Sequence, residues 1–413
     1  MSGTIQALRE RKDVMRDIGG TVAKGFEKLK DAFVEGQAAD EGGAQLCIYR
    51  HGKKVVDLWC GRDKVNDRPY TDKTIAVMMS CSKGAVATCA HMLAERGLLD
   101  LDAPVTRYWP EFGQAGKQDV PVSYLLSHRV GLTSFEPAAG IEPRDLLNWD
   151  KCTSALAAME PLWEPGTAYM YHAVTYGYLV GEVIRRVSGK TPGRFFADEI
   201  AGPLGLQMWI GLPLAEESRV APHFSDRPAL TVEQWKMLLA GFGIDVESRV
   251  SRAMMHMLVG TDEAIAMINR REGHAGEIPA ANMIGDAASL AKMYAATIGE
   301  VDGVRLLKPE TVNRARSPQT DGLKAPGDFA KLPNADPQRL GLGYELNRRV
   351  EPMLGEGSFG HAGAGGRMGF AHPESGVAVG YVCNNMLWDG IRGPDDRWVP
   401  WTKALREAVG MAA

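Results

Sequence analysis

Cysteine is scarce in this sequence and follows no pattern. The 413 residues include six cysteines, with no C-x-x-C pair and no regular spacing. In a chain of this length such cysteines are typical of buried free thiols and not of a disulfide framework.

The sequence also has no uncharged apolar run long enough to cross a bilayer, and its first residues lack the apolar core of a signal peptide. We therefore expect a cytoplasmic protein without a membrane span.

Neither sign of charge dominates the composition. Lys and Arg number 47 and Asp and Glu number 51, which gives a formal net charge of -4, with the two signs interspersed. Nucleic acids and anionic membrane surfaces are bound by basic patches, so the composition excludes both as partners. The nine histidines show neither H-E-x-x-H nor a comparable ligand spacing. We therefore predict no metal site and no cofactor.

Strand-like runs lie near both ends of the chain. In the first part, residues 44–50 and 54–60 are joined by His51-Gly52, a pair typical of a tight hairpin turn. An amphipathic helix is predicted before them, over residues 20–35, from apolar residues at helical spacing. Near the other end the predicted strands are 342–347, 367–371 and 377–382, followed by a helix over residues 400–409.

The middle of the chain is mostly helical and is interrupted by proline and glycine. Strands at both ends with helices between them predict an α+β protein. In the simplest arrangement, residues 1–75 and 296–413 build one sheet domain, residues 76–295 form an inserted, mainly helical domain, and the active site lies at their junction. The helices predicted in the insert are 78–96, 123–126, 176–188, 194–200, 231–239 and 287–296.

Ser80 and Lys83 stand at the start of the helix predicted over residues 78–96. That helix is apolar nearly all round, so it belongs in a core, where lysine is rare unless it is paired or functional. Residues three apart share one helix face, and a lysine amine whose pKa is lowered by desolvation can help to take the proton of a serine nucleophile. The alternative is that Ser80 or Ser82 only caps the helix and that Lys83 is solvated, because S-x-x-K also occurs by chance.

Two further segments contain candidate residues. Tyr171 directly precedes the helix predicted over residues 176–188, and by itself it is typical of a core aromatic residue. His361 lies in a glycine cluster, residues 360–366, and such a cluster beside a strand lets a ligand approach the backbone closely. The cluster is not the dinucleotide fingerprint, because Met368 stands where its last glycine should be.

Together these segments resemble the superfamily of class C β-lactamases and penicillin-binding proteins, and within it the family VIII carboxylesterases. The shared order is Ser-x-x-Lys, then a tyrosine, then His-x-Gly near the C-terminal strands. Residues 125–132 (LLSHRVGL) are similar to the family's Leu-Leu-x-His-x-x-Gly-Leu stretch, and residues 202–206 (GPLGL) to its Pro-Leu-Gly turn. The resemblance covers residues 25–410. It implies a β-lactamase-like fold, an α/β sandwich with an antiparallel sheet flanked by helices.

The resemblance also implies a role for each candidate residue. Ser80 corresponds to the nucleophile, Lys83 to its activating partner, and Tyr171 to the general base that later acts as an acid. The segment His361-Ala362-Gly363 falls where β-lactamases carry Lys-Thr-Gly. The oxyanion hole then consists of the backbone N–H groups of Ser80 and of Ala364, which follows Gly363.

Two positions depart from the β-lactamase pattern. Ala173 stands at the asparagine of Tyr-x-Asn, and His361 at the lysine of Lys-Thr-Gly. Both departures favour a serine carboxylesterase that hydrolyses small, short-acyl esters through an acyl-enzyme on Ser80. Four alternatives stay open on the same site: a β-lactamase, a D-amino-acid amidase or peptidase, an acyltransferase, and a non-catalytic binding protein. The resemblance assigns no role to His172.

Two expectations concern the neighbours of these residues. His361 is expected to face Tyr171 and to keep the ordinary imidazole pKa near 6.5, so that activity depends on pH between about 5 and 8. Ser82 is expected to point about 200° away from Ser80 on the helix. Its replacement by alanine is therefore expected to be mild.

Overall fold

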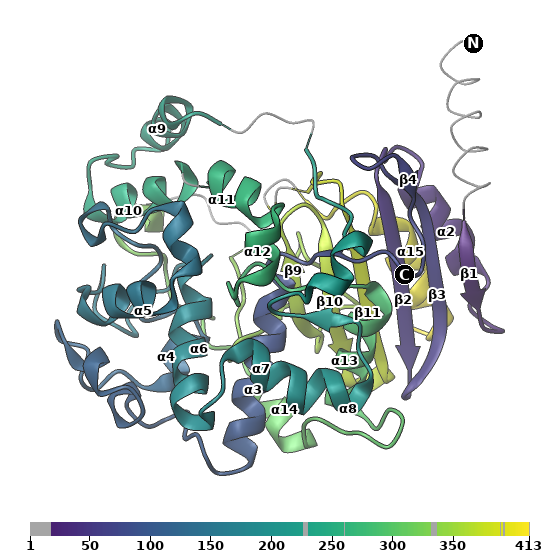
Figure 1. The fold of residues 1–413 in the computed structure, drawn as a ribbon, viewed down its shortest axis with the longest axis horizontal. Coiled ribbons are helices and arrows are strands. Elements are labelled where there is room, and N and C mark those ends of the chain that lie inside the picture. Colours follow the sequence, from purple (N-terminus) through teal and green to yellow (C-terminus); the bar gives the residue numbers. More distant parts are fainter. Residues whose placement is uncertain are drawn as a thin grey trace.

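The computed structural model describes residues 18–225, 230–259, 261–331, 337–388, 390 and 393–412. An antiparallel sheet lies beside a mostly helical region (Figure 1). The strand order is β1-β3-β2-β11-β10-β9-β8, with β4 paired to β3. The strands are β1 Gly19–Val22, β2 Gly43–Arg50, β3 Lys53–Asp63, β4 Arg68–Pro69, β8 Glu345–Leu346, β9 Phe359–Gly363, β10 Arg367–His372 and β11 Val377–Cys383.

The sheet joins the two ends of the chain. Strand β2 pairs with β11 from Ala44 and Cys383 at one end to Arg50 and Val377 at the other, and Figure 1 shows the purple N-terminal strands beside the yellow C-terminal ones. The hairpin between β2 and β3 turns at His51-Gly52, where both residues have positive φ angles. The predicted hairpin is therefore confirmed, and strands from both parts of the chain lie in one sheet.

Helices cover both faces of the sheet. Helices α2 (Lys28–Gln37) and α15 (Val399–Ala408) pack together on one face, and α13 (Ala287–Ile298) packs on the other, over β2, β10 and β11. Side chains of a strand alternate between the two faces, so in β2 Leu46 belongs to the core under α2 and α15 while Cys47 belongs to the opposite core. The predicted α+β architecture, an antiparallel sheet flanked by helices, is confirmed.

Helix α3 (Cys81–Glu95) lies between the sheet and the helical region. Every residue from Cys81 to Leu93 is buried, because α3 packs against β9 and β10 on one side and against α6 and α7 on the other. This position explains why its sequence is apolar all round. The helical region contains α4 Val122–Leu126, α5 Trp149–Ala158, α6 Thr175–Ser188, α7 Pro192–Phe196, α8 Gly202–Leu204, α9 Val232–Gly241, α10 Arg249–Val259, α11 Thr261–Ile268, α12 Arg271–Ala275 and, nearer the sheet, α14 Pro309–Ala315.

Some predicted bounds differ from the structure. The helix predicted over residues 20–35 begins too early, because β1 (Gly19–Val22) pairs with β3 and α2 starts only at Lys28. At Gly20 the φ angle is +117° and a Cβ would lie 1.9 Å from the Asp57 carbonyl oxygen, so glycine permits this close strand contact. The strand predicted over 342–347 shortens to Glu345–Leu346, and β9 was not predicted as a strand. The division at residues 75, 76, 295 and 296 stays a prediction.

Candidate active site

Ser80 lies where a short strand passes into α3. The strand β5 (Ala76–Val77) belongs to a small sheet with β7 (Ile284–Gly285) and β6 (Met208–Trp209). Met79 then has a φ angle of 48°, a left-handed conformation uncommon outside glycine. Ser80 occupies the N-cap position, but its side chain makes no capping hydrogen bond, and the residue is only half-buried. The hydroxyl is therefore free of the capping role that was the alternative to a catalytic one.

Lys83 is buried against the Ser80 hydroxyl. Its Nζ donates to Ser80 Oγ at 3.1 Å and to the carbonyl oxygens of Ala173 at 2.7 Å and Ala280 at 2.9 Å. Its relative exposure is 0%, which rules out a solvated first-turn lysine. Burial lowers the pKa of Lys83 to about 7, although the nearby Glu345 carboxyl acts in the opposite direction. Near neutral pH the amine is therefore present in both protonation states.

Tyr171 lies against this pair. The centre of its ring is 4.8 Å from Lys83 Nζ. Burial raises the pKa of Tyr171 well above its usual value, and a hydrogen bond with the Ser80 side chain offsets only part of that rise. At neutral pH Tyr171 is thus a phenol and not a phenolate. Of the two groups, Lys83 is the one able to accept a proton in the free enzyme.

Two histidines hold the segment that carries Tyr171. The ring of His128 stacks on Tyr171, with ring centres 4.9 Å apart, and its Nδ1 accepts a hydrogen bond from the backbone N–H of His172 at 2.9 Å. His172 Nε2 accepts from the Leu132 N–H at 3.1 Å, so Nδ1 carries the proton and donates to the Met170 carbonyl at 2.7 Å. His172, to which the resemblance assigned no role, is therefore a buried residue that holds this segment in place.

His361 lies on β9 and faces Tyr171, as expected, with ring centres 6.0 Å apart. Its Nδ1 is 2.6 Å from the Ala362 carbonyl oxygen and 3.2 Å from Glu345 Oε2, so Nδ1 carries the proton. Its Nε2 is buried and has no partner within the described part of the chain. Burial, together with the charge of Lys83, lowers the pKa of His361 to about 3. The expectation that His361 titrates between pH 5 and 8 is therefore wrong, and Lys83 is the site residue that titrates there.

Glu345 is a site neighbour that the sequence motifs missed. Its side chain is buried, Oε1 accepts from Gln338 Nε2 at 2.7 Å, and Oε2 accepts from the Ala362 N–H at 2.8 Å. Burial raises its pKa. The carboxyl holds β9 beside β8 and keeps the His361 ring in one orientation. The signal in the sequence was a glutamate within the strand predicted over residues 342–347, whose neighbours are mostly uncharged.

Gly363 brings β9 against the Ser80 segment. A Cβ at this position would lie 2.4 Å from the Met78 carbonyl oxygen and 3.3 Å from Cys81 Sγ, so glycine serves a backbone contact here and not the approach of a ligand. Ala364 follows in an exposed turn. Neither its N–H nor that of Ser80 donates a hydrogen bond to a residue that the structure describes. Both N–H groups are thus available to an oxyanion.

Ser82 is more important to the structure than the sequence suggested. It is fully buried, its Oγ donates to the Met79 carbonyl at 2.5 Å, and the same oxygen accepts from the Met283 N–H at 3.0 Å. Alanine at this position leaves a buried N–H without its partner, which destabilises a protein by about 1–3 kcal/mol. The structure therefore gives no reason to expect that Ser82→Ala has only a mild effect on the protein.

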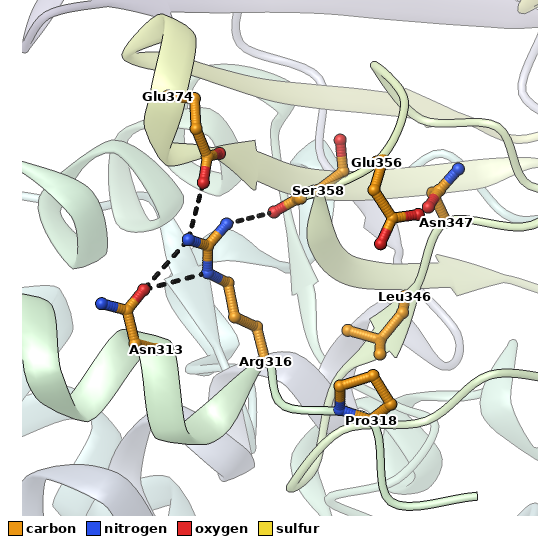
Figure 2. Close-up of a pocket in the computed structure, with 9 residues that line it drawn as sticks. Asn313, Arg316, Pro318, Leu346, Asn347, Glu356, Ser358 and Glu374 are labelled. Atoms are coloured by element: carbon orange, nitrogen blue, oxygen red, sulfur yellow. Dashed lines mark hydrogen bonds and ion pairs between the residues drawn. The ribbon is translucent and has the colours of Figure 1, made fainter. Parts of the chain in front are cut away.

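A separate cavity of about 340 Å³ lies at the edge of the sheet, beside α14 and β8 (Figure 2). Arg316 in its wall pairs with Glu374 at 2.6 Å and donates to Asn313 Oδ1 and to the Gly357 carbonyl. No predicted site residue lines this cavity.

Within the residues that the structure describes, no cluster of His, Cys, Asp or Glu is placed to hold a metal ion, and no helix is long and apolar enough to cross a membrane.

Comparison with known proteins assigns the family. The β-lactamase family model matches residues 29–399. The chain belongs to the β-lactamase family. Within that family it is similar to the esterase/beta-lactamase LipL of Mycobacterium tuberculosis, with 34% identity over 90% of this chain and 83% of LipL. It is also similar to the esterase EstB of Burkholderia gladioli, with 27% identity over 89% of this chain and 90% of EstB.

Solved structures of the family agree with this assignment. A family VIII carboxylesterase is 32% identical with a TM-score of 0.81, over 95% of this chain and 99% of that one. A penicillin-binding protein homologue from Caulobacter crescentus is 32% identical with a TM-score of 0.74, over 95% and 100% of the two chains. The predicted resemblance and the predicted β-lactamase-like fold are therefore confirmed.

Proposed function

We propose that the protein is a serine carboxylesterase that hydrolyses small, short-acyl esters through an acyl-enzyme on Ser80. The observation that carries this proposal is the buried Lys83 amine, hydrogen-bonded to Ser80 Oγ at 3.1 Å and with its pKa lowered to about 7. Such an amine activates a neighbouring hydroxyl without a histidine base. The esterases among the relatives and the family VIII carboxylesterase structure support an ester as the substrate.

In the proposed acylation step, neutral Lys83 takes the hydroxyl proton of Ser80 while Oγ forms a bond to the ester carbonyl carbon. The carbonyl oxygen becomes an oxyanion, and the N–H groups of Ser80 and Ala364 donate hydrogen bonds to it. The C–O bond to the alcohol then breaks, and the Tyr171 hydroxyl donates its proton to the leaving alkoxide. The Lys83 ammonium replaces that proton, which restores the phenol.

Deacylation runs through the same groups. A water molecule attacks the acyl carbon while Lys83, now neutral again, removes the water proton by way of Tyr171. The oxyanion forms in the same place, and the bond between the acyl carbon and Ser80 Oγ breaks as that oxygen takes a proton from the Lys83 ammonium, which returns Lys83 to its neutral form. This assignment gives the first proton transfer to Lys83 rather than to Tyr171, because burial keeps Tyr171 a phenol.

The environment of Ser80 favours uncharged esters over β-lactams and amides. The backbone carbonyl of Ala173 holds Lys83, and its methyl side chain offers no hydrogen bond to an acylamino group. His361, at the position of the β-lactamase lysine, is a buried neutral imidazole and gives no charge to attract a substrate carboxylate. A missing polar contact of this kind weakens a transition state by about 1–3 kcal/mol, and a small ester needs neither contact.

A substrate panel tests this proposal. We expect kcat/KM for p-nitrophenyl acetate or butyrate to exceed that for benzylpenicillin by at least about a hundredfold, equivalent to about 2.7 kcal/mol of transition-state stabilisation. Similar efficiency on both would make the protein a β-lactamase. The same assay with an added short-chain alcohol separates hydrolysis from acyl transfer, because an acyltransferase releases a new ester in place of the acid.

A further inference from the structure

Arg367 is a fully buried arginine to which the proposed mechanism gives no part. It is the first residue of β10 and has a relative exposure of 0%. A charged guanidinium is stable in a protein interior only when hydrogen bonds replace its water. Its contacts therefore identify the groups that it holds in place.

The guanidinium bridges the two segments that carry the oxyanion N–H groups. Arg367 Nε donates to the Val77 carbonyl oxygen at 3.2 Å, at the end of the strand that leads to Ser80. Arg367 Nη1 donates to the Ala364 carbonyl oxygen at 2.8 Å, in the turn after β9. One rigid planar group thus joins the backbone before Ser80 to the backbone of Ala364.

A second guanidinium holds the same turn. The turn closes through a hydrogen bond from the Gly366 N–H to the Gly363 carbonyl at 3.0 Å, and Arg397 Nη2 donates to the Gly365 carbonyl. A Cβ on Gly365 would lie 2.3 Å from Arg367 Nη1, and a Cβ on Gly366 would lie 2.1 Å from Arg397 Nη2. These two glycines therefore give the arginines room to reach the turn.

We propose that Arg367 is a positioning residue for the oxyanion hole, because it sets the separation of the Ser80 and Ala364 N–H groups. The inference rests on the proposed esterase function and deepens it. Donors that are fixed before the reaction stabilise an oxyanion best, since they need no rearrangement when the charge develops. Arginine suits this position because its planar fork reaches two carbonyl groups at once, which the single ammonium of lysine does not do in the same geometry.

The test uses Arg367→Lys and Arg367→Gln in the full-length protein. For p-nitrophenyl butyrate we expect kcat to fall about tenfold to a hundredfold with KM little changed, less than the effect of removing one oxyanion donor outright. The affinity for phenylboronic acid, which forms a tetrahedral adduct with a serine nucleophile, should fall in parallel with kcat/KM. A loss confined to folding does not produce this parallel change.

Loss of Arg367 also leaves two carbonyl groups without a partner, so both variants should have a lower Tm. The matched control is Trp401→Leu, a buried residue of α15 on the opposite side of the sheet, which should lower Tm while leaving kcat and boronate affinity unchanged. Variants of Arg367 that behave like this control, or that keep wild-type boronate affinity, would overturn the inference. A wild-type protein without ester turnover would overturn the proposed function, and the inference with it.

Discussion

Lys83 combines complete burial with hydrogen bonds to two backbone carbonyls and to the Ser80 hydroxyl. The carbonyls fix the position of the amine, and burial makes its protonated form less favourable, so the pKa falls from 10.5 to about 7. An exposed lysine would remain an ammonium at neutral pH and would not take a proton. The reactivity proposed for Ser80 therefore depends on the surroundings of one neighbouring residue.

The pH dependence of ester hydrolysis follows from Lys83. Below pH 7 the amine is protonated and cannot accept the Ser80 proton, so we expect kcat/KM to rise about tenfold per pH unit toward pH 7 and then to level off. Kinetics from pH 5 to 9 measure this directly. The control is His361→Ala, which should lower activity without moving the midpoint, because His361 is neutral throughout this range. A midpoint that disappears in His361→Ala would assign the titration to the histidine.

Helix α3 and strand β9 are in contact. This contact brings the candidate site residues of the two elements close to each other. The two elements approach closely at Gly363, where a Cβ would lie 2.4 Å from the Met78 carbonyl oxygen and 3.3 Å from Cys81 Sγ. Gly84 makes room for Tyr294 of α13, because a Cβ there would lie 2.1 Å from Tyr294 Oη. β9 then places His361 and Ala364 beside the N-terminus of α3. The site is thus formed by a helix start and a strand end that are far apart in the sequence.

Gly363→Ala tests this contact. A methyl group 2.4 Å from the Met78 carbonyl oxygen forces β9 away from the Ser80 segment, and a displacement of about 1 Å in an active site lowers activity by about a hundredfold. Esterase kcat and Tm should both fall. Gly241→Ala is the control, because nothing lies within 4 Å of a Cβ there and alanine is favoured over glycine in a helix by about 0.5–1 kcal/mol. Wild-type kcat in Gly363→Ala would show that the close contact is not needed for activity.

Local sequence patterns were enough to predict some of the helices and strands and some of the candidate site residues. The hairpin at His51-Gly52 follows from two residues, and Ser80 and Lys83 are recognisable because their spacing on one helix face is local. Arg367 could not be assigned in this way, since one of its partners, Val77, lies in a distant part of the chain. The strand β1 was missed for the same reason, because its partner β3 and not its own composition determines it.

Across the whole molecule, several histidines are buried in an uncharged state. Burial lowers the pKa of His91 to about 4 and those of His172, His223 and His361 to about 3, and it lowers that of His128 as well. The unfolded chain binds more protons at these positions between pH 6.5 and 4, so they make the folded state less stable as pH falls. Buried carboxyls with raised pKa values, among them Glu351 at about 7, act in the opposite direction.

His91 isolates this effect, because it lies away from the site and the hydrogen bond described for its ring is the one that Nε2 donates to the Leu342 carbonyl oxygen at 2.7 Å. We expect the stability advantage of the wild type over His91→Gln to shrink by about 2 kcal/mol between pH 7 and pH 5. Denaturant unfolding of both proteins at the two pH values measures the difference. A difference that stays constant with pH would show that His91 is not held neutral in the fold.

The proposed function requires Ser80 to be a nucleophile that Lys83 activates, and covalent labelling reports on that activation. The wild type and Lys83→Ala are incubated with a fluorophosphonate at pH 8, and the modified peptide is identified by mass spectrometry. We expect the wild type to carry the label on Ser80, and Lys83→Ala, which keeps the serine, to react at least about a thousandfold more slowly. A label on another residue would show that Ser80 is not the nucleophile, and equal labelling rates in the two proteins would show that Lys83 does not activate it.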